Sequence, residues 1–494
     1  MRKLFIISTA LVALAAMLCG CTYNEQEGRM SDKPLAIFPD YADVTIPANI
    51  APLNFRIEGS NAKAQTRFVS GENSVVVSSS DSRIIIAERK WRKIVDAATA
   101  GNGTIEVVVS VKEADGWVTY EPFKINVAPH PIDSHIAYRL IEPGYESWCE
   151  MGIYQRNIEN FEQKPIIENS AADYGCINCH SFCQQSPDKM LFHMRQMHTG
   201  TIITDGKKIE KLNTTTPETR SPLVYPSWHP SGKYVAFTNN LTRLINLPND
   251  HNRVEVYDGA SDVVVYDVER HEILTSRNLF STRYFETFPT FSPDGGKLYF
   301  CSADSVAMPD EFKSAKYSLC VIDFDAESRR FGEKVDTLYN AHTGGRSVSF
   351  PRVSPDGRYM LYALADYGNF SIWHRDADLK MIDLTTGNEV DMSAANSDAA
   401  ESYHSWSSNS RWILFNSRRV NGLYTHAYIA YVDEQGKVHK PFLLPQHDPD
   451  FYDRFMKSYN IPEFITGEVE LNSYDIAQFA KEDKGIDLKF HMQE

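Results

Sequence analysis

The sequence predicts an all-β protein, and three observations lead to that prediction. Aromatic residues are abundant, with 25 Tyr, 26 Phe and 7 Trp in a chain of 494 residues, and such residues favour strands. The 26 Gly and 24 Pro indicate many turns between short strands. A segment with one pattern also recurs along the second half of the chain, and such repeats indicate a protein built from copies of one structural unit.

The repeated segment has four clear copies, which begin at Tyr225, Phe288, Phe350 and Tyr403 and lie 63, 62 and 53 residues apart. Each copy starts on an expected strand, continues into a Ser-Pro-Asp-Gly-like turn and enters a second strand. Proline presets φ in such a turn, and glycine accepts a positive φ. Another pair of expected strands follows each copy. Four strands in a unit that cannot bury both of its faces alone predict the blade of a β-propeller.

Two further blades are expected before these four. Residues 178–182 and 186–192 form a degenerate copy on either side of a short insertion. Three more strands are expected upstream, at 137–142, 149–157 and 163–168. A strand from the C-terminal region is expected to close this first blade. Six blades are therefore favoured, with five or seven as the alternatives.

The turn segment resembles the hallmark of the TolB-like or PD40 (WD40-like) propeller family, in which Pro-x-hydrophobic-Ser-Pro-Asp-Gly recurs. Residues 289–295 (Pro-Thr-Phe-Ser-Pro-Asp-Gly) match this pattern, and the resemblance covers about residues 176–445. Residues 408–410 (Ser-Asn-Ser) replace Pro-Asp-Gly in the last copy, so the type of turn is open there. The chain is also similar to lipoproteins of the Bacteroidetes type that combine such blades with a Cys-x-Asn-Cys-His-Ser-Phe segment.

The segments around the propeller divide the chain into five parts. They are 1–21, a lipoprotein signal peptide; 22–33, a flexible tether; 34–129, an Ig-like or fibronectin-like β-sandwich; 130–447, the propeller; and 448–494, a partly helical tail. The sandwich is predicted from apolar and polar residues that alternate in six short stretches. These stretches are 43–47, 53–58, 74–78, 83–87, 104–112 and 118–127, with a short helix expected at 91–100.

The N-terminus predicts export and lipid attachment. Met1-Arg2-Lys3 precedes about 14 apolar residues, which is typical of a secretory signal and too short for a permanent membrane span. Residues 18–21 (Leu-Cys-Gly-Cys) resemble the bacterial lipobox, and this resemblance implies a lipid on Cys21. An ordinary secretory signal that is cleaved elsewhere is the alternative. Anchoring in the outer membrane is expected, with the periplasmic face favoured over the cell surface.

The charge balance limits the partners of the protein. Lys and Arg number 50 against 65 Asp and Glu, which gives a net charge of −15. Nucleic acids and anionic lipid surfaces attract a cationic face, so neither is expected as a partner. The expected partners are the membrane, reached through the N-terminal lipid, and an envelope protein or redox partner.

Residues 176–180 (Cys-Ile-Asn-Cys-His) are the attachment signature of c-type haem. In such a site the two thiols add to the vinyl groups of one porphyrin, and the adjacent imidazole is the proximal iron ligand. Covalent haem c on Cys176, Cys179 and His180 is therefore predicted. Two alternatives stay open, because the same residues could form a structural disulfide or, together with Cys183, hold zinc.

The residues that follow the signature include candidates for a second axial ligand of the haem iron. These candidates are His193, Met194, Met197 and His198, and each also has an ordinary interpretation as a packed or surface residue. Consecutive residues of a strand face opposite ways, so His193 and Met194 cannot both reach one iron.

The remaining cysteines of an exported protein are expected to be paired, because the compartment is oxidising. The candidate disulfides are Cys149 with Cys183 and Cys301 with Cys320.

Three functions are compatible with these features. The first is an envelope haem protein that transfers electrons or senses a ligand. The second is a non-enzymatic, TolB-like scaffold that binds proteins and carries Cys176 and Cys179 as a disulfide. The third is a glycan-active propeller enzyme, in which His229, His342 and His404 near the blade entries would line a central site. The sequence has no phosphate-binding loop, nucleophile elbow or zinc-protease helix motif, so no catalytic residue is predicted and a non-enzymatic role is favoured.

Overall fold

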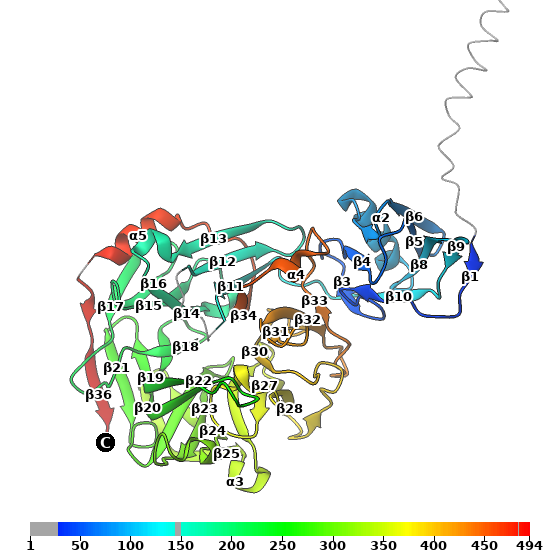
Figure 1. Ribbon diagram of the computed structural model, residues 1–494. Coiled ribbons are helices and arrows are strands. Elements are labelled where there is room, and N and C mark those ends of the chain that lie inside the picture. The colour runs from blue at the N-terminus through cyan, green and yellow to red at the C-terminus, as the bar shows by residue number, and fades with distance from the viewer. Residues whose placement is uncertain (1–27, 144–149, 483) are drawn as a thin grey trace, which may run out of the picture.

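The computed structural model describes residues 28–143, 150–482 and 484–494, and it shows a strand-rich N-terminal domain packed against a propeller (Figure 1). Strands make up most of the described elements, which confirms the all-β prediction. No helix in these three ranges is long and apolar enough to cross a membrane. Cys21 and Cys149 lie outside the described residues, so the predicted lipid site and one half of the predicted Cys149–Cys183 disulfide lie there too.

The propeller consists of six sheets, called blades 1 to 6 here, whose first strand is the innermost. Blade 1 contains β34 (Ser458–Ile465), β11 (His135–Ile141), β12 (Gly152–Asn157) and β13 (Gln163–Glu168). Blade 2 contains β14 (Cys176–Phe182), β15 (Met190–Arg195), β16 (Gly200–Thr204), β17 (Ile209–Asn213) and β35 (Ile486–Asp487). Blade 3 contains β18 (Val224–Trp228), β19 (Tyr234–Asn246), β20 (Val254–Asp267), β21 (Glu272–Ser276) and β36 (Lys489–Gln493).

The other three blades have four strands each. Blade 4 contains β22 (Tyr284–Phe291), β23 (Lys297–Asp304), β24 (Ser318–Asp325) and β25 (Arg330–Tyr339). Blade 5 contains β26 (Ser347–Val353), β27 (Tyr359–Ala365), β28 (Asp378–Asp383) and β29 (Glu389–Val390). Blade 6 contains β30 (Glu401–Trp406), β31 (Trp412–Ser417), β32 (His426–Tyr431) and β33 (Phe442–Leu443).

The innermost strands close a ring, because each of them contacts the next around the axis, from β14 through β18, β22, β26 and β30 to β34. Strand β34 pairs antiparallel with β11 and completes blade 1. Six is also the blade number that the sequence favoured. The boundary predicted at 447/448 is wrong, however, because β34, β35 and β36 of the tail belong to propeller sheets.

Each innermost strand contains one residue with a positive φ, between 43° and 54°, next to an irregularity in the strand. These six residues, called the central ring here, are Cys179, Tyr225, Phe288, Phe350, Tyr403 and Ile461. Their side chains meet on the axis, since the ring centroids of consecutive aromatic members are 4.3–4.6 Å apart. Four of them are the residues that begin the repeated segment. The segment around Ile461 (Ile-Pro-Glu-Phe) is a further copy that sequence analysis missed.

The first two strands of blades 3 to 6 are joined by one type of turn. In blades 4 and 5, Gly295 and Gly357 have φ of 78° and 76° and donate their N–H groups to the carbonyls of Ser292 and Ser354. In blade 6, Ser410 takes the glycine position with φ 61°, and its N–H bonds the Ser407 carbonyl in the same way. The turn left open by sequence analysis therefore has the same hydrogen bond as its counterparts. We call this end of the propeller the turn end.

The N-terminal domain has two sheets and a helix. The strands are β1 (Arg29–Met30), β2 (Ile37–Phe38), β3 (Thr45–Pro47), β4 (Phe55–Ile57), β5 (Ala64–Ser70), β6 (Asn73–Ser79), β7 (Arg83–Ile84), β8 (Thr104–Glu113), β9 (Gly116–Thr119) and β10 (Phe123–Ala128). Strands β2, β4 and β7 form the smaller sheet, and the other seven form the larger one. Helix α2 (Glu88–Ala100) buries its apolar face, including Trp91 and Ile94, against the larger sheet. The short helix expected at 91–100 is therefore present, and it adds a helical layer to the two sheets.

The remaining elements are short, apart from one helix in the tail. They are α3 (Ala341–Gly344), α4 (Phe451–Arg454), α5 (Ser473–Lys481) and the 3₁₀ turns η1 (Asn169–Ala172), η2 (Cys183–Gln185), η3 (Phe312–Ser314) and η4 (Ser371–Trp373). Helix α5 packs on blades 1 and 2, so the tail is partly helical, as predicted.

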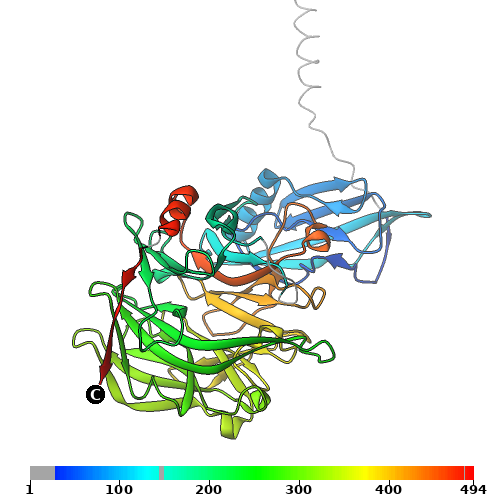
Figure 2. The ribbon, with the colours of Figure 1, turned by 60° about the vertical axis from the view of Figure 1, so that its left-hand side comes forward.

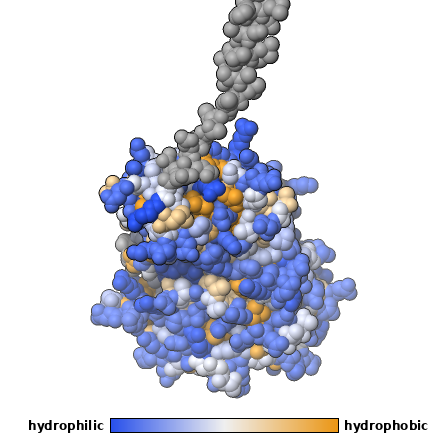
Figure 3. Space-filling model, turned by 90° about the vertical axis from the view of Figure 1, so that its right-hand side faces the viewer, coloured by the Kyte–Doolittle hydropathy of each residue, from blue (hydrophilic) through white to orange (hydrophobic). Residues whose placement is uncertain are grey.

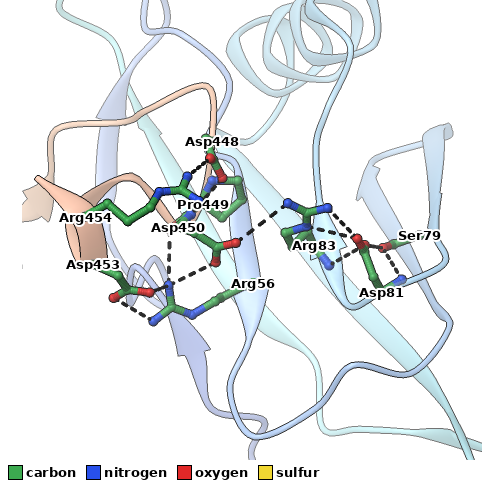
Figure 4. A network of polar contacts seen from close by, with 9 residues as sticks. All are labelled: Arg56, Ser79, Asp81, Arg83, Asp448, Pro449, Asp450, Asp453 and Arg454. Atoms are coloured by element: carbon green, nitrogen blue, oxygen red, sulfur yellow. Dashed lines mark hydrogen bonds and ion pairs between the residues drawn. The ribbon is translucent and has the colours of Figure 1, made fainter.

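Ion pairs join the N-terminal domain to the tail (Figure 4). Arg56 of β4 contacts Asp450 at 3.2 Å and Asp453 at 2.6 Å, and Arg83 reaches Asp450 at 3.7 Å. Apolar residues of the domain also share one hydrophobic cluster with blade 6. The domain is therefore packed firmly on the propeller.

Candidate functional site

The haem signature lies on β14, the innermost strand of blade 2. Cys176 is partly exposed, whereas Cys179 and His180 are buried. Cys179 is the blade 2 member of the central ring, with a φ of 52°, and the strand is irregular between Asn178 and Ser181. This irregularity sends the side chains of Cys179 and His180 in different directions.

Cys179 faces the axis of the propeller, where it lies close enough to Tyr225 and Tyr403 to influence their pKa values. His180 instead packs toward blade 1, and its Nε2 lies 3.8 Å from Oε2 of Glu463 on β34. Neither ring nitrogen of His180 has a hydrogen-bond partner among the described residues. Burial lowers the pKa of His180 to about 3, helped by the positive charge of Arg139, so the ring is neutral.

These residues do not fit a haem in this fold. A c-type haem needs both thiols along one porphyrin edge and the imidazole above the iron, with open space around the macrocycle. Here the His180 side chain is 0% exposed and lies between two packed strands, while Cys179 belongs to the central ring. Within the described ranges, no group of three or more His, Cys, Asp or Glu side chains could hold a metal ion.

The candidates for a second axial ligand are dispersed around blade 2. His193 is buried and shares a hydrogen bond of 3.0 Å with the hydroxyl of Thr201. Met194 lies in the hydrophobic cluster on the other face of the sheet. Met197 is exposed, and His198 pairs with Asp173 at 2.7 Å. Among the described residues, none of the four shares a hydrogen bond or an ion pair with His180, so the structure does not gather them around it.

The predicted disulfide between Cys301 and Cys320 is wrong. Cys301 pairs in register with Leu319, and Cys320 pairs with Phe300. Adjacent residues of a strand face opposite sides of the sheet, so the two thiols point into different hydrophobic clusters. Cys183 is also a free, buried thiol and packs near Trp228 between blades 2 and 3.

The three histidines proposed for a central site do not converge. His229 shares hydrogen bonds with Ser231 and with the Gly295 carbonyl. His404 is buried and bonds the Leu361 carbonyl at 3.1 Å. His342 is exposed on α3 and contacts Asp304 at 3.2 Å. Each of them therefore has a local structural role.

A site that sequence analysis did not predict is built by the second and third strands of blade 3. Strands β19 and β20 are the longest of the propeller, and the register between them continues from Tyr234 to Asn246. This extended hairpin, called the arm here, projects beyond the other blades (Figure 2). In blade 3, the 24 residues at 238–261 connect the second and third expected strands, and the corresponding connections of blades 4 and 5 are shorter. This length is the sequence signal that could have revealed the arm.

The arm lies against blades 4 and 5. At its tip, Asp250 accepts a bond from Lys313 at 2.9 Å, and the side chain of Asn252 bonds the backbone N–H of Arg375 at 3.2 Å. Glu255 of the arm and His374 of blade 5 share a buried hydrogen bond of 2.9 Å. The arm is thus fixed in place by polar contacts on both blades.

Asp258 provides the innermost of these contacts. Its carboxyl group accepts hydrogen bonds from Asn240, Thr242 and Asn369, with distances of 2.6–2.9 Å. Burial raises the pKa of Asp258 to about 6, although the three hydrogen bonds oppose this shift. The carboxyl group is therefore sensitive to mildly acidic pH.

A cavity of about 630 Å³ opens between the arm tip and the loops of blades 5 and 6. We call it the arginine cavity, because four arginines line it together with other polar residues. Its lining consists of Asp250, His251, Arg253, Trp373, Arg375, Ser397, Asp398, Ala399, Ala400, Arg418, Arg419, Asn421, Gly422 and Leu423. An adjoining cavity of about 670 Å³ shares Asp250, Arg375 and Asp398 and extends toward Lys313 and Arg346.

Comparison with known proteins adds only distant likeness. No family model matches the sequence, and no curated protein matches it. A periplasmic gluconolactonase of Pseudomonas aeruginosa has a TM-score of 0.34 and 13% identity over 66% of this chain and 99% of its own. A DUF4784 family protein from Bacteroides caccae has a TM-score of 0.29 and 10% identity over 74% of this chain and 96% of its own. Prolyl oligopeptidase B from Galerina marginata has a TM-score of 0.33 and 10% identity over 71% of this chain and 50% of its own. At this level the likenesses carry no argument about function.

Proposed function

We propose that this protein is a lipid-anchored envelope protein that binds an acidic oligosaccharide in the arginine cavity without converting it. The observation that carries this proposal is the gathering of four arginines in one cavity of a chain whose net charge is −15. Two carboxylates, Asp250 and Asp398, lie among them, and Arg419 also pairs with the buried Glu401 at 3.0 Å, so the four arginines still exceed the three carboxylates by one positive charge. A concave surface of this charge attracts anionic ligands.

Two of the arginines, Arg253 and Arg375, are exposed and can meet a ligand, whereas Arg418 is buried. The Arg418 guanidinium lies 3.4 Å from the ring centroid of Trp373, and its Nε donates to the Ile372 carbonyl. Arg375 donates its Nε to the Asp398 carbonyl. Arg253 is exposed and makes no ion pair with any carboxylate that the structure describes. Planar guanidinium groups bind carboxylate and sulfate groups with two parallel hydrogen bonds.

The rest of the lining favours a sugar over a peptide. Ser397, Asn421, Asp398 and His251 offer donors and acceptors for hydroxyl groups, and Trp373 offers an aromatic surface. Peptide-binding sites usually present an open strand edge or an apolar groove. The cavity is formed by loops and a hairpin tip. The face of the molecule in Figure 3 is largely hydrophilic, with apolar residues gathered in its upper part and again lower down.

Binding rather than catalysis is supported by the surroundings of the acidic groups. The pKa of Asp250 is lowered by the Asn252 N–H and by Lys313, so this carboxylate stays ionised at neutral pH and is poorly suited to donate a proton. The buried pair of Glu255, on the arm, and His374, on blade 5, does not line the cavity. The two residues hold the arm in place.

The test is calorimetric titration of the full-length protein with a hexamer of galacturonic acid. A neutral hexamer of galactose and a hexamer of glutamic acid serve as comparisons. We expect binding of the acidic sugar, weakened at least tenfold in Arg375→Ala and in Arg253→Ala and reduced by salt. Arg89→Ala, on the exposed surface of α2, is the matched control and should change nothing. Equal binding of the neutral sugar, or binding of the glutamate peptide alone, would overturn the proposal.

A further inference from the structure

A second, smaller cavity lies at the turn end of the propeller, inside the central channel. Its volume is about 130 Å³, and its walls include Ser181, Gln185, Ser227, Thr290, Arg352 and Glu463. It is separate from the arginine cavity, with which it shares no lining residue. We call it the channel pocket.

The walls of the channel pocket follow from the repeat. Two positions after each central-ring residue, the innermost strand carries a second residue, and these six residues form a second layer along the channel. They are Ser181, Ser227, Thr290, Arg352, Ser405 and Glu463. Four members are small hydroxyl residues, whereas blades 5 and 1 supply a cation and a carboxyl group. The repeat therefore places one arginine and one glutamate in an otherwise small, polar layer.

Arg352 and Glu463 do not pair with each other. Neither has a Lys, Arg, Asp or Glu partner within 4.0 Å among the described residues, and the guanidinium Nη1 donates only to the Pro351 carbonyl, at 3.0 Å. Glu463 Oε2 is buried without a hydrogen-bond partner and lies 3.8 Å from Nε2 of His180. Buried polar groups of native proteins usually have a partner, so Glu463 is a wall residue with an unused polar atom, and Arg352 is a second wall residue whose guanidinium has no ionic partner among the described residues.

The protonation states of Glu463 and His180 determine which charge a ligand of the channel pocket must have. Burial raises the pKa of Glu463 to about 8, although Arg352 and the Phe182 N–H oppose this shift. His180, on the other side of the carboxyl group, is neutral. At neutral pH the pocket thus holds a guanidinium cation, a protonated carboxyl group that can donate a hydrogen bond, and several hydroxyl groups. This combination is complementary to an anion.

We infer that the channel pocket binds a small carboxylate of about six non-hydrogen atoms or fewer. Arg352 holds the carboxylate oxygens, and Glu463 and the hydroxyl groups of Ser227 and Thr290 donate to them. The size limit follows from the volume, because a cavity of about 150 Å³ accepts a molecule the size of benzene. The inference does not depend on the proposed sugar site.

The experiment is titration of the full-length protein with acetate, followed by NMR line broadening of its methyl group, with methylammonium as the cation of equal size. We expect acetate to bind and methylammonium not to bind. Arg352→Gln should weaken acetate binding at least tenfold, whereas Arg89→Gln, on the exposed surface of α2, should leave it unchanged.

The pH profile gives a second test that does not depend on Arg352 being replaceable. Acetate affinity should fall about tenfold for each pH unit above 8 as Glu463 loses its proton, and Glu463→Gln should keep the affinity and remove this dependence. An unchanged affinity in Arg352→Gln, or a stronger affinity for methylammonium, would overturn the inference. So would an acetate affinity that is insensitive to pH in the unmodified protein.

Discussion

The imidazole of His180 and the carboxyl group of Glu463 lie 3.8 Å apart, although 282 residues separate them in the chain. One belongs to the haem-like signature on β14, and the other belongs to the strand that closes blade 1. This contact places the last residue of the signature at the interface between blades 1 and 2.

We expect no covalent haem on this protein when it is isolated from its native membranes. His180 is enclosed between two strands, so it cannot take the place of a proximal ligand without opening the blade interface. A pyridine haemochrome spectrum of the denatured chain measures this directly. A c-type α band that stays with the chain, and that is lost in Cys176→Ser, would contradict the expectation and restore haem attachment.

The thiols are expected to differ in reactivity. Cys176 is partly exposed and should be alkylated by iodoacetamide in the folded protein, slowly at neutral pH because burial raises the pKa of its thiol. Cys179, Cys301 and Cys320 should react only after denaturation. Mass spectrometry of the labelled peptides checks the order of reaction. A disulfide peptide that joins Cys301 to Cys320 would show that the register of β23 and β24 differs from the one described here.

Two glycines in equivalent turns provide a matched pair of substitutions. A Cβ at Gly295 would lie 2.2 Å from Nε2 of His229, whereas a Cβ at Gly357 meets nothing within 4 Å. Both residues have positive φ, which costs about 1 kcal/mol for alanine. Gly357→Ala should therefore lower the free energy of unfolding by about 1 kcal/mol, and Gly295→Ala by about 3 kcal/mol or more. Chemical denaturation measures both, and equal losses would contradict the close approach of blades 3 and 4.

The stability of the protein is expected to depend on Asp258 in mildly acidic solution. Its pKa is raised on folding, so its stabilising contribution is fully present below about pH 4 and is lost as the pH rises through about 6. Relative to Asp258→Asn, the free energy of unfolding of the unmodified protein should fall by about 3 kcal/mol over that interval. Denaturation series at pH 4, 5, 6 and 7 measure the difference. A constant difference would show that the arm leaves Asp258 hydrated.

Arg56 is expected to stabilise the junction between the N-terminal domain and the tail. Arg56→Ala removes contacts with Asp450 and Asp453 and should lower the free energy of unfolding by about 1 kcal/mol. Arg83→Ala, whose side chain is 43% exposed, is the control and should have a smaller effect. Because the two domains share a hydrophobic cluster, both variants should still unfold in one calorimetric transition. Two separate transitions would mean that the domains are independent.

Much of the fold could be predicted from the sequence, because it depends on local chemistry that repeats. Aromatic entry residues such as Tyr225 recur in blades 3 to 6, and turn glycines such as Gly295 recur in blades 3 to 5, because the local backbone of such a turn favours them. The copy around Ile461 was missed because an aliphatic residue stands where the other copies have an aromatic residue and no Ser-Pro-Asp-Gly turn follows it.

The candidate sites depended on contacts between distant segments, which a sequence pattern does not contain. The direction of His180 is set by a strand irregularity and by Glu463 of another blade, so a motif that is complete in five consecutive residues still does not fit its usual ligand. Arg253 and Arg375 line one cavity only because the arm crosses to blade 5. The blades could be predicted because turn chemistry is local and repeats along the chain. Which side chains face one another depends on strand register and on the closure of the ring, so only the folded arrangement reveals it.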